Sequence, residues 1–156
     1  MLQIRPFQSS DAPVLRRTFF NAIRTINIRD YTQAQVRAWA PDKVDEADWS
    51  ARLTSINPFV AVLDGEVVGY SDLQDDGYID HFFCHADYQG KGIGKALMNR
   101  IFDSATERNI TRLYSHVSIT AKPFFEHFGF VVVKPQTVTI RGEALNNFVM
   151  ENRSIK

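Results

Sequence analysis

Three glycines alternate over residues 90–94, directly between a strand-like segment and an amphipathic helical segment. Glycine permits positive φ angles and lets a ligand approach the backbone closely. At the start of a helix, successive amide groups and the helix dipole together favour an anion. Lys91 and Lys95 add positive charge beside these amides. We therefore predict a phosphate-binding loop over residues 89–95.

Two nucleotide-binding motifs do not fit this loop. The P-loop requires Ser or Thr after its Gly-Lys pair and a Gly five residues before that pair. Here Ala96 follows Gly94-Lys95, and Gln89 occupies the earlier position. The dinucleotide fingerprint requires a Gly three residues after its second Gly, where this chain has Lys95 or Leu97. The loop therefore belongs to neither class.

The hydrophobic pattern divides the chain into a helical first part and a mixed second part. We predict strands at residues 2–5, 59–63, 66–73, 78–84, 113–117, 130–134 and 147–151, and helices after Ser9-Ser10-Asp11 and at residues 32–38, 46–56, 92–108 and 121–128. The three consecutive strands between residues 59 and 84 predict an antiparallel meander. Residues 146–151 are predicted to form a free edge for strand pairing. The order predicts a mixed α+β fold with a largely antiparallel sheet.

Length and charge exclude several classes of protein. A chain of 156 residues with 44% hydrophobic residues fits one domain, residues 1–156, with an ordinary core. Lys plus Arg and Asp plus Glu are 18 each, so the zero net charge argues against bulk binding to nucleic acid or anionic membranes. No apolar segment approaches the ~20 residues that span a bilayer. We expect a cytoplasmic protein.

Cysteine and histidine counts limit redox and metal chemistry. Cys84 is the single cysteine, so an intramolecular disulfide and a four-cysteine zinc site are both excluded. The four histidines show no paired ligand spacing on one helix or hairpin. We therefore predict no bound metal.

The loop matches the pattern Gln/Arg-x-x-Gly-x-Gly/Ala over residues 89–94, which resembles the acetyl-CoA motif of the GNAT acetyltransferase superfamily. Residues 79–88 resemble the strand and turn before this motif, and residues 121–130 resemble a second family block, a helix that ends in Gly-Phe. The resemblance is clearest over residues 59–133. It implies the GNAT fold, with a mostly antiparallel central sheet flanked by helices. It also implies transfer of an acetyl group from acetyl-CoA to a primary amine of a small molecule or protein.

The resemblance implies a set of coenzyme A contacts. The backbone amide of Cys84 is expected to polarise the thioester carbonyl, and such a donor can supply a few kcal/mol. Ser118 stands where many relatives carry an Asn. The implied cofactor-binding residues are Phe82, Phe83, Cys84, Gln89, Gly90, Lys91, Gly92, Ile93, Gly94, Lys95, Ser118 and Phe125.

One position departs from the family pattern. Many relatives protonate the leaving thiolate with a Tyr, where this chain has Phe125. A thiol with a pKa near ~8.5 can leave without such an acid. Tyr114 and Tyr31 are alternative proton donors. The departure also leaves open an alternative function, a weak or inactive GNAT-fold module that binds coenzyme A as a sensor.

A lysine-like amine has a pKa near ~10.4, so a general base is needed to make it nucleophilic. By resemblance we expect His116 to be this base, followed by Asp80 and then His81. Neighbours on a strand point to opposite faces, so Asp80 and His81 are not expected to share the cleft.

The first half of the chain is expected to build the acceptor pocket. Tyr31, Trp39 and His81 are the predicted substrate-binding residues. Alternatively, Trp39 and Trp49 pack their helices onto the sheet. Dimers are common among GNAT proteins, so we expect a monomer or a homodimer.

Overall fold

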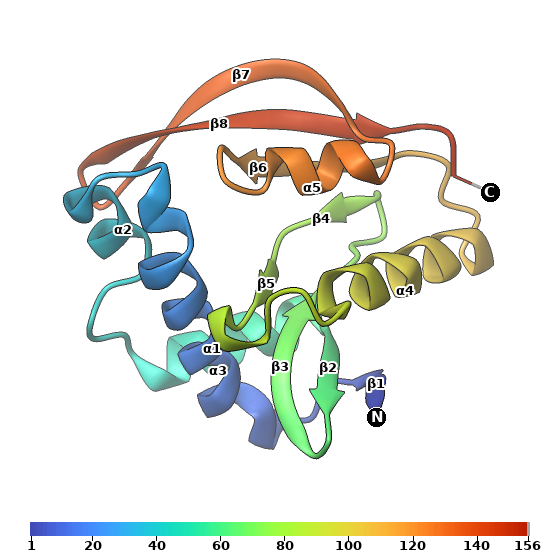
Figure 1. The fold of residues 1–156 in the computed structure, drawn as a ribbon, viewed down its shortest axis with the longest axis horizontal. Helices are drawn as coiled ribbons and strands as arrows, with labels where there is room; N and C mark the ends of the chain where they lie inside the picture. Colours follow the sequence, from blue (N-terminus) through green and yellow to red (C-terminus); the bar gives the residue numbers. More distant parts are fainter. Residues whose placement is uncertain (156) are drawn as a thin grey trace.

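The computed structural model describes residues 1–155, which form two four-stranded sheets that diverge from each other (Figure 1). The first sheet is antiparallel throughout, with the order β1 (Leu2–Pro6), β2 (Phe59–Leu63), β3 (Glu66–Ser71) and β5 (Phe82–Cys84). The second sheet has the order β4 (Tyr78–Ile79), β6 (Leu113–Ser118), β8 (Glu143–Asn152) and β7 (Val131–Ile140). Within it, β4 and β6 run parallel and the other pairs run antiparallel. The predicted α+β class is confirmed.

Helices cover both faces of the first sheet. On one face, α1 (Ala12–Thr25) and α3 (Glu46–Ile56) bury Leu15 and Leu53 against Val60 and Tyr70. On the other face, α4 (Ile93–Glu107) packs against neighbouring residues of the same strands. Two shorter helices, α2 (Gln33–Trp39) and α5 (Lys122–His127), lie near the second sheet (Figure 1). Short 3-10 turns are η1 (Ser9–Asp11), η2 (Asn27–Arg29) and η3 (Ala86–Tyr88).

Local sequence signals explain where the early helices begin. Thr32 caps α2, and its hydroxyl accepts a hydrogen bond from the Gln35 amide while the Gln35 side chain accepts from the Thr32 amide. The Asp45 side chain caps α3 by accepting a hydrogen bond from the Asp48 amide. Such caps satisfy amides that have no partner in the helix, and each typically stabilises a helix by about 1 kcal/mol.

The prediction of one strand over residues 78–84 is wrong. The strand is interrupted at Asp80 and His81. Their amides both donate to Oδ1 of the buried Asp72, at 3.0 and 2.6 Å. The Asp72 carboxylate thus takes the place of a neighbouring strand as the hydrogen-bond acceptor for these two amides. Before the break the chain pairs with β6 in the second sheet, and after it with β3 in the first. The two sheets diverge from this break.

The C-terminal strands are longer than predicted, because they form one hairpin with ten residues in each arm. Its turn is at Arg141 and Gly142, which both have positive φ angles. The prediction of a free edge at residues 146–151 is wrong, since β8 lies between β6 and β7. The edge strands of this sheet are β4 and β7.

Candidate active site

Two cavities adjoin where the sheets diverge. The first, of about 430 Å³, lies among β5, the start of α4 and α5, and we call it the loop cavity. The second, of about 340 Å³, lies beneath the β7–β8 hairpin, and we call it the hairpin cavity. Five residues line both cavities: Phe82, Phe83, Ser118, Ala121 and Phe125. The cavities therefore meet at β5.

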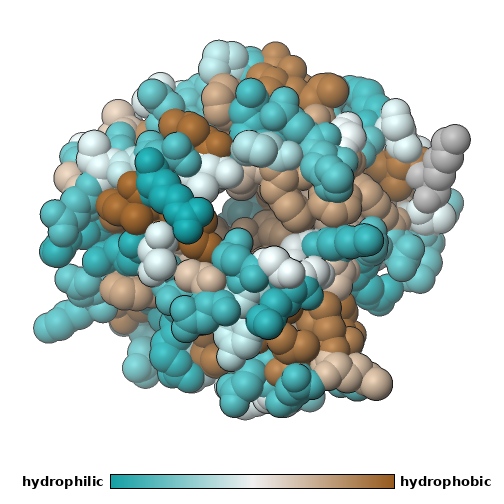
Figure 2. All heavy atoms as spheres, viewed as in Figure 1, coloured by the Kyte–Doolittle hydropathy of each residue, from teal (hydrophilic) through white to brown (hydrophobic). Residues whose placement is uncertain are grey.

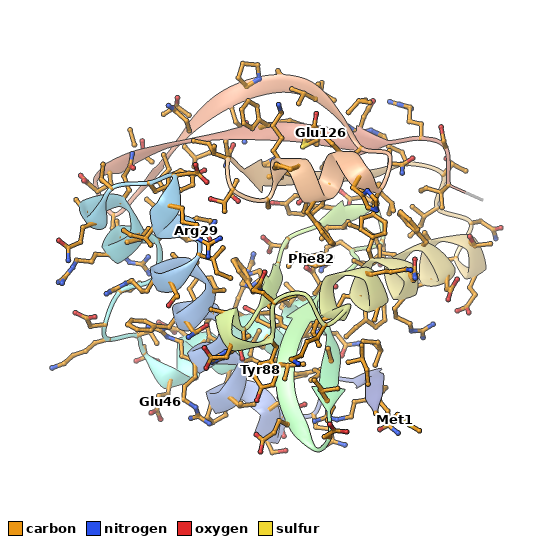
Figure 3. The ribbon with its side chains drawn as sticks, viewed as in Figure 1. Met1, Arg29, Glu46, Phe82, Tyr88 and Glu126 are labelled. Atoms are coloured by element: carbon orange, nitrogen blue, oxygen red, sulfur yellow. The ribbon has the colours of Figure 1, made fainter. Side chains whose placement is uncertain are left out.

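Figure 2 shows a hollow near the centre of the displayed face, between polar side chains and a patch of apolar ones. Figure 3 places Phe82 at the centre of this opening, with Tyr88 and Glu126 on opposite sides of it. Phe82 contacts the rings of Phe124 and Phe125, with ring centroids 5.2 and 5.7 Å apart. One wall of the opening is therefore aromatic.

The glycine loop presents free amides to the loop cavity. Gly90 and Gly92 both have φ angles of 77°, and Gly92 is the N-cap of α4 without any side-chain cap. The first four amides of a helix lack partners within it. A Cβ atom at Gly90 or Gly92 would meet no atom within 4 Å, so these glycines are needed for their backbone angles. The start of α4 therefore suits an anion.

Gly94 has a different role, because a Cβ atom there would lie 2.9 Å from the Phe124 ring. This glycine lets α5 pack closely against the start of α4. Ile93 is only 2% exposed and packs its side chain in the core beside Val68, so its contribution to the loop is its backbone. Of the predicted cofactor residues, all but Lys91 line the loop cavity.

The open edge of β5 directs one amide into the loop cavity. The His85 amide donates to the Val68 carbonyl of the neighbouring strand at 2.8 Å. Because successive strand amides point to opposite edges, the Cys84 amide faces the open side. Burial raises the pKa of the Cys84 thiol to about 12, so this thiol stays protonated near neutral pH and is a poor nucleophile. The useful group at this position is the amide.

Two polar residues of the loop cavity were missed by the sequence analysis. The Asn27 side chain donates to Ser118 Oγ at 3.2 Å, and the same oxygen accepts from the Ala121 amide at 3.0 Å. Thr120 Oγ1 is buried and has no hydrogen-bond partner within residues 1–155. Asn27 lies 91 residues from Ser118, and no local pattern signals their contact.

The hairpin cavity brings the predicted acceptor-side residues together: Tyr31, Trp39, Asp80, His81 and His116 all line it. The expectation that Asp80 and His81 do not share the cleft is wrong, because the strand is broken at these two residues and the alternation of side chains is lost. Asp80 pairs with Arg52, whereas His116 is exposed and its ring centroid lies 5.3 Å from that of Tyr78. Trp49 instead packs in the core and donates to the Ala12 carbonyl.

His81 is held by a buried tyrosine. Its Nδ1 lies 2.9 Å from the Tyr70 hydroxyl, which has no other partner within residues 1–155. Burial raises the pKa of Tyr70 and lowers that of His81, so both are neutral at pH 7. Because the tyrosine hydroxyl has no other acceptor within residues 1–155, donation of its proton to Nδ1 satisfies both groups and would place the ring proton on Nε2. We infer that His81 is a hydrogen-bond donor rather than a base.

The tyrosines predicted as alternative acids are otherwise occupied. The Tyr31 hydroxyl donates to the Asn146 carbonyl at 2.6 Å and accepts from the Ile119 amide at 3.0 Å. Tyr114 donates to Asp76 and lines neither cavity. Tyr78, which the sequence analysis missed, does line the hairpin cavity, and burial raises its pKa to about 12.

Comparison with known proteins identifies the family. The profile described as "Acetyltransferase (GNAT) domain" matches residues 27–142. The uncharacterised N-acetyltransferase YafP of Escherichia coli K12 is 34% identical over 149 residues, which is 96% of this chain and 94% of YafP. A GCN5-related N-acetyltransferase from Rhodopseudomonas palustris has a TM-score of 0.93 at 33% identity, over 97% of this chain and 94% of that one.

The same fold occurs in a more distant structure, the PaiA N-acetyltransferase of Thermoplasma acidophilum in complex with coenzyme A. Its TM-score is 0.76 at 17% identity, over 98% of this chain and 99% of that one. The family match and the 34% identity to YafP show that this chain belongs to the GNAT family of acetyltransferases. It is an acyltransferase.

Residues 1–155 contain neither a metal-binding cluster nor a membrane-spanning helix. No cluster of three or more His, Cys, Asp or Glu side chains is arranged to hold a metal ion. No helix in this part of the chain is both long and apolar enough to cross a membrane.

Proposed function

We propose that the protein transfers the acetyl group of acetyl-CoA to a primary amine. The observation that carries this proposal is the meeting of two cavities at the open edge of β5, beside the Cys84 amide. One cavity offers helix-start amides and an aromatic wall, which suit the pyrophosphate and the pantetheine arm of coenzyme A. PaiA, which shares the fold, binds coenzyme A. The other cavity offers a place for the amine.

The residues of the loop cavity would hold the donor in a defined way. Gln89 to Lys95, with Lys91 at the exposed outer side, would bind the pyrophosphate, and Phe82, Phe83 and Phe125 would contact the arm. Acetyl-CoA supplies an activated acetyl thioester when bound. The Cys84 amide would donate a hydrogen bond to the thioester oxygen as negative charge develops there, and such a donor is worth about 3 kcal/mol. Ser118, fixed by Asn27, would contact the donor near the junction of the cavities.

The amine must lose a proton before it attacks, and His116 is the best-placed base. His116 lines the hairpin cavity, and its ring makes no hydrogen bond within residues 1–155. Asp80 is the second choice, because its carboxylate already pairs with Arg52. His81 donates from Nε2 and would orient the acceptor. Phe125 supplies no proton, so the leaving group departs as a thiolate, which a thiol pKa near ~8.5 allows.

The proposal extends to the setting of the reaction. We propose a cytoplasmic location, because the reaction needs acetyl-CoA. We also propose that the protein works as a monomer or homodimer, since one chain lines both cavities. The acceptor is a small-molecule or protein amine, and the zero net charge gives no support to a nucleic-acid partner.

Release of free thiol from acetyl-CoA tests the proposal. With a panel of primary amines, we expect release that saturates with both substrates and acetylated amine as the matching product by mass spectrometry. Binding of coenzyme A measured by calorimetry gives an independent readout. Tight binding without release above background across the panel would instead support the sensor module.

A further inference from the structure

The tip of the β7–β8 hairpin is fastened to the segment around α2, and we call these contacts the hairpin latch. Gln35 Nε2 donates to the Ala144 carbonyl at 2.8 Å, and Arg141 donates to the Ala38 carbonyl at 2.7 Å. The Tyr31 hydroxyl donates to the Asn146 carbonyl at 2.6 Å. Figure 1 shows this end of the hairpin lying against α2. The latch closes one side of the hairpin cavity.

Apolar packing supports the latch. Leu145, on β8, is 3% exposed and packs with Tyr31 and Val36 in one cluster, which Val138 and Ile140 of β7 join. Burial of these apolar side chains stabilises the contact between the hairpin and α2. A polypeptide could pass between α2 and the hairpin only by separating this cluster. At about 340 Å³, the cavity is also near the lower end of ligand pockets, which start at roughly 300 Å³.

The walls of the hairpin cavity are largely apolar, and their aromatic residues include Phe19, Tyr31, Trp39, Tyr78, Phe82 and Phe83. Asp80 contributes the one carboxylate, and within residues 1–155 no Lys or Arg lines the cavity. Aromatic faces attract apolar groups and amine cations. A carboxylate or phosphate on the acceptor would lose its water here without meeting a cation, which is costly.

One buried polar atom of this cavity lacks a partner within residues 1–155. The side-chain oxygen of Asn147 is buried and accepts no hydrogen bond within residues 1–155. Buried acceptors are nearly always satisfied, so an unsatisfied one that lines a cavity suits a ligand donor. An amine N–H is such a donor. Asn147 and Asp80 together therefore offer acceptors at two points of a largely apolar wall.

We propose that the acceptor is a small amine with an aromatic or aliphatic body and no carboxylate or phosphate, held whole within the hairpin cavity by Asn147. This inference rests on the proposed acetyl transfer and narrows its acceptor. It disfavours lysine side chains and amino termini of proteins, because the latch closes the route between α2 and the hairpin and the cavity is small. It also excludes amino acids.

A matched set of acceptors tests the inference: 2-phenylethylamine, phenylalanine, and a blocked peptide with one lysine. The first two share one skeleton and differ by a carboxylate. We expect kcat/KM for 2-phenylethylamine to exceed that for phenylalanine by at least about 100-fold, as expected for burying an unpaired charge. The peptide should show no measurable acetylation. Comparable values for phenylalanine or the peptide would overturn the inference.

A variant pair tests the role of Asn147. Asn147→Leu should raise KM for 2-phenylethylamine about 10-fold, which corresponds to a lost hydrogen bond, with no change in the affinity for coenzyme A. Gln136→Leu is the matched control, because Gln136 pairs with Asn147 across the hairpin and also has an unpartnered amide atom, yet lines neither cavity. We expect its KM to be unchanged. An equal effect of both variants would overturn the role of Asn147.

Different experimental outcomes would overturn the inference about the acceptor and the proposed acetyl transfer. Acetyl transfer to a broader amine panel with none to 2-phenylethylamine overturns the inference and leaves the function standing. Absence of coenzyme A binding in calorimetry, together with no transfer to any amine, overturns the proposed function itself.

Discussion

The loop cavity and the hairpin cavity share a wall but are built by different means. Much of the loop cavity comes from one stretch of chain, residues 82–95, and offers backbone amides at the edge of β5 and the start of α4. The hairpin cavity gathers side chains from α1, α2, β6 and the hairpin, and from the break between β4 and β5. A backbone site depends on glycines and local geometry, whereas a side-chain site depends on distant contacts. Donor binding and acceptor choice can therefore change separately.

The largest effect is expected when the expected base is removed from the hairpin cavity, and this change should leave the loop cavity unaffected. His116→Ala should lower kcat by between about 100- and 1000-fold, the usual contribution of a general base. The KM for acetyl-CoA should stay near its starting value, because His116 does not line the loop cavity. An unchanged kcat in His116→Ala, with the loss of kcat appearing in Asp80→Asn instead, would move the role to Asp80.

Asp72 lies at the break between β4 and β5, where the two cavities meet, and its ionisation should destabilise the fold. Burial raises its pKa from 3.8 to about 6. Between these values the native state binds more protons than the unfolded state, so the free energy of unfolding should fall as the pH rises. The fall attributable to Asp72 should approach about 3 kcal/mol and be complete somewhat above pH 6.

Asp72→Asn should remove this contribution, because the amide does not ionise but still offers Oδ1 to the amides of Asp80 and His81. Urea unfolding at pH 4, 5, 6 and 7 measures the effect. The variant should gain stability relative to the natural protein as the pH rises. Parallel profiles for the two proteins would contradict the role given to Asp72.

Backbone strain introduced at one glycine tests whether the loop cavity binds the acetyl donor. Gly92→Val should raise the KM for acetyl-CoA about 10-fold, because valine disfavours a φ of 77° and would disturb the amides that face the anion. Gly65→Val is the matched control, with a φ of 85° and open space around its Cβ atom, in a turn that lines neither cavity. Both variants should lose similar stability, measured by thermal unfolding. Equal KM values in the two variants would rule out the loop as the donor site.

The smallest effect is expected where the cavities share a wall. Phe125→Tyr adds the hydroxyl that the family resemblance implies at this position, but Phe125 is 3% exposed and packs against Phe82, Phe124 and Phe130. We expect kcat to rise less than about 3-fold, since a thiol with a pKa near ~8.5 leaves readily without an acid. Stopped-flow thiol release would measure the change. A gain of tenfold or more would show that protonation of the leaving group limits the reaction.

The local parts of the fold were predictable from sequence. The predicted bounds of α3 and β2 agree with the structure, because Asp45 caps the helix and Pro58 precedes a continuous apolar strand. The glycine loop was also found, since its spacing is a local signal. These features depend on residues that are neighbours in the chain.

The parts that were missed depend on distant contacts. The apolar run over residues 78–84 gives no sign that Asp72 will accept two of its amides and break the strand. The full length of β7 was not predicted, because much of this strand is solvent-exposed: Val131 is 61% and Val133 51% exposed. No alternation of apolar and polar residues therefore marks a buried face. Asn147 and Asn27 gain their positions only when the hairpin and η2 reach the cleft.

The latch also bears on the order in which the molecule folds. Its three hydrogen bonds join residues that are 103, 109 and 115 positions apart in the chain. Closing a long loop costs conformational entropy before any contact repays it, and long-range contacts slow folding. We expect this end of the hairpin to dock late in refolding and to open early in hydrogen exchange. A molecule caught at that stage would already bind its acetyl donor but would not yet discriminate among amines.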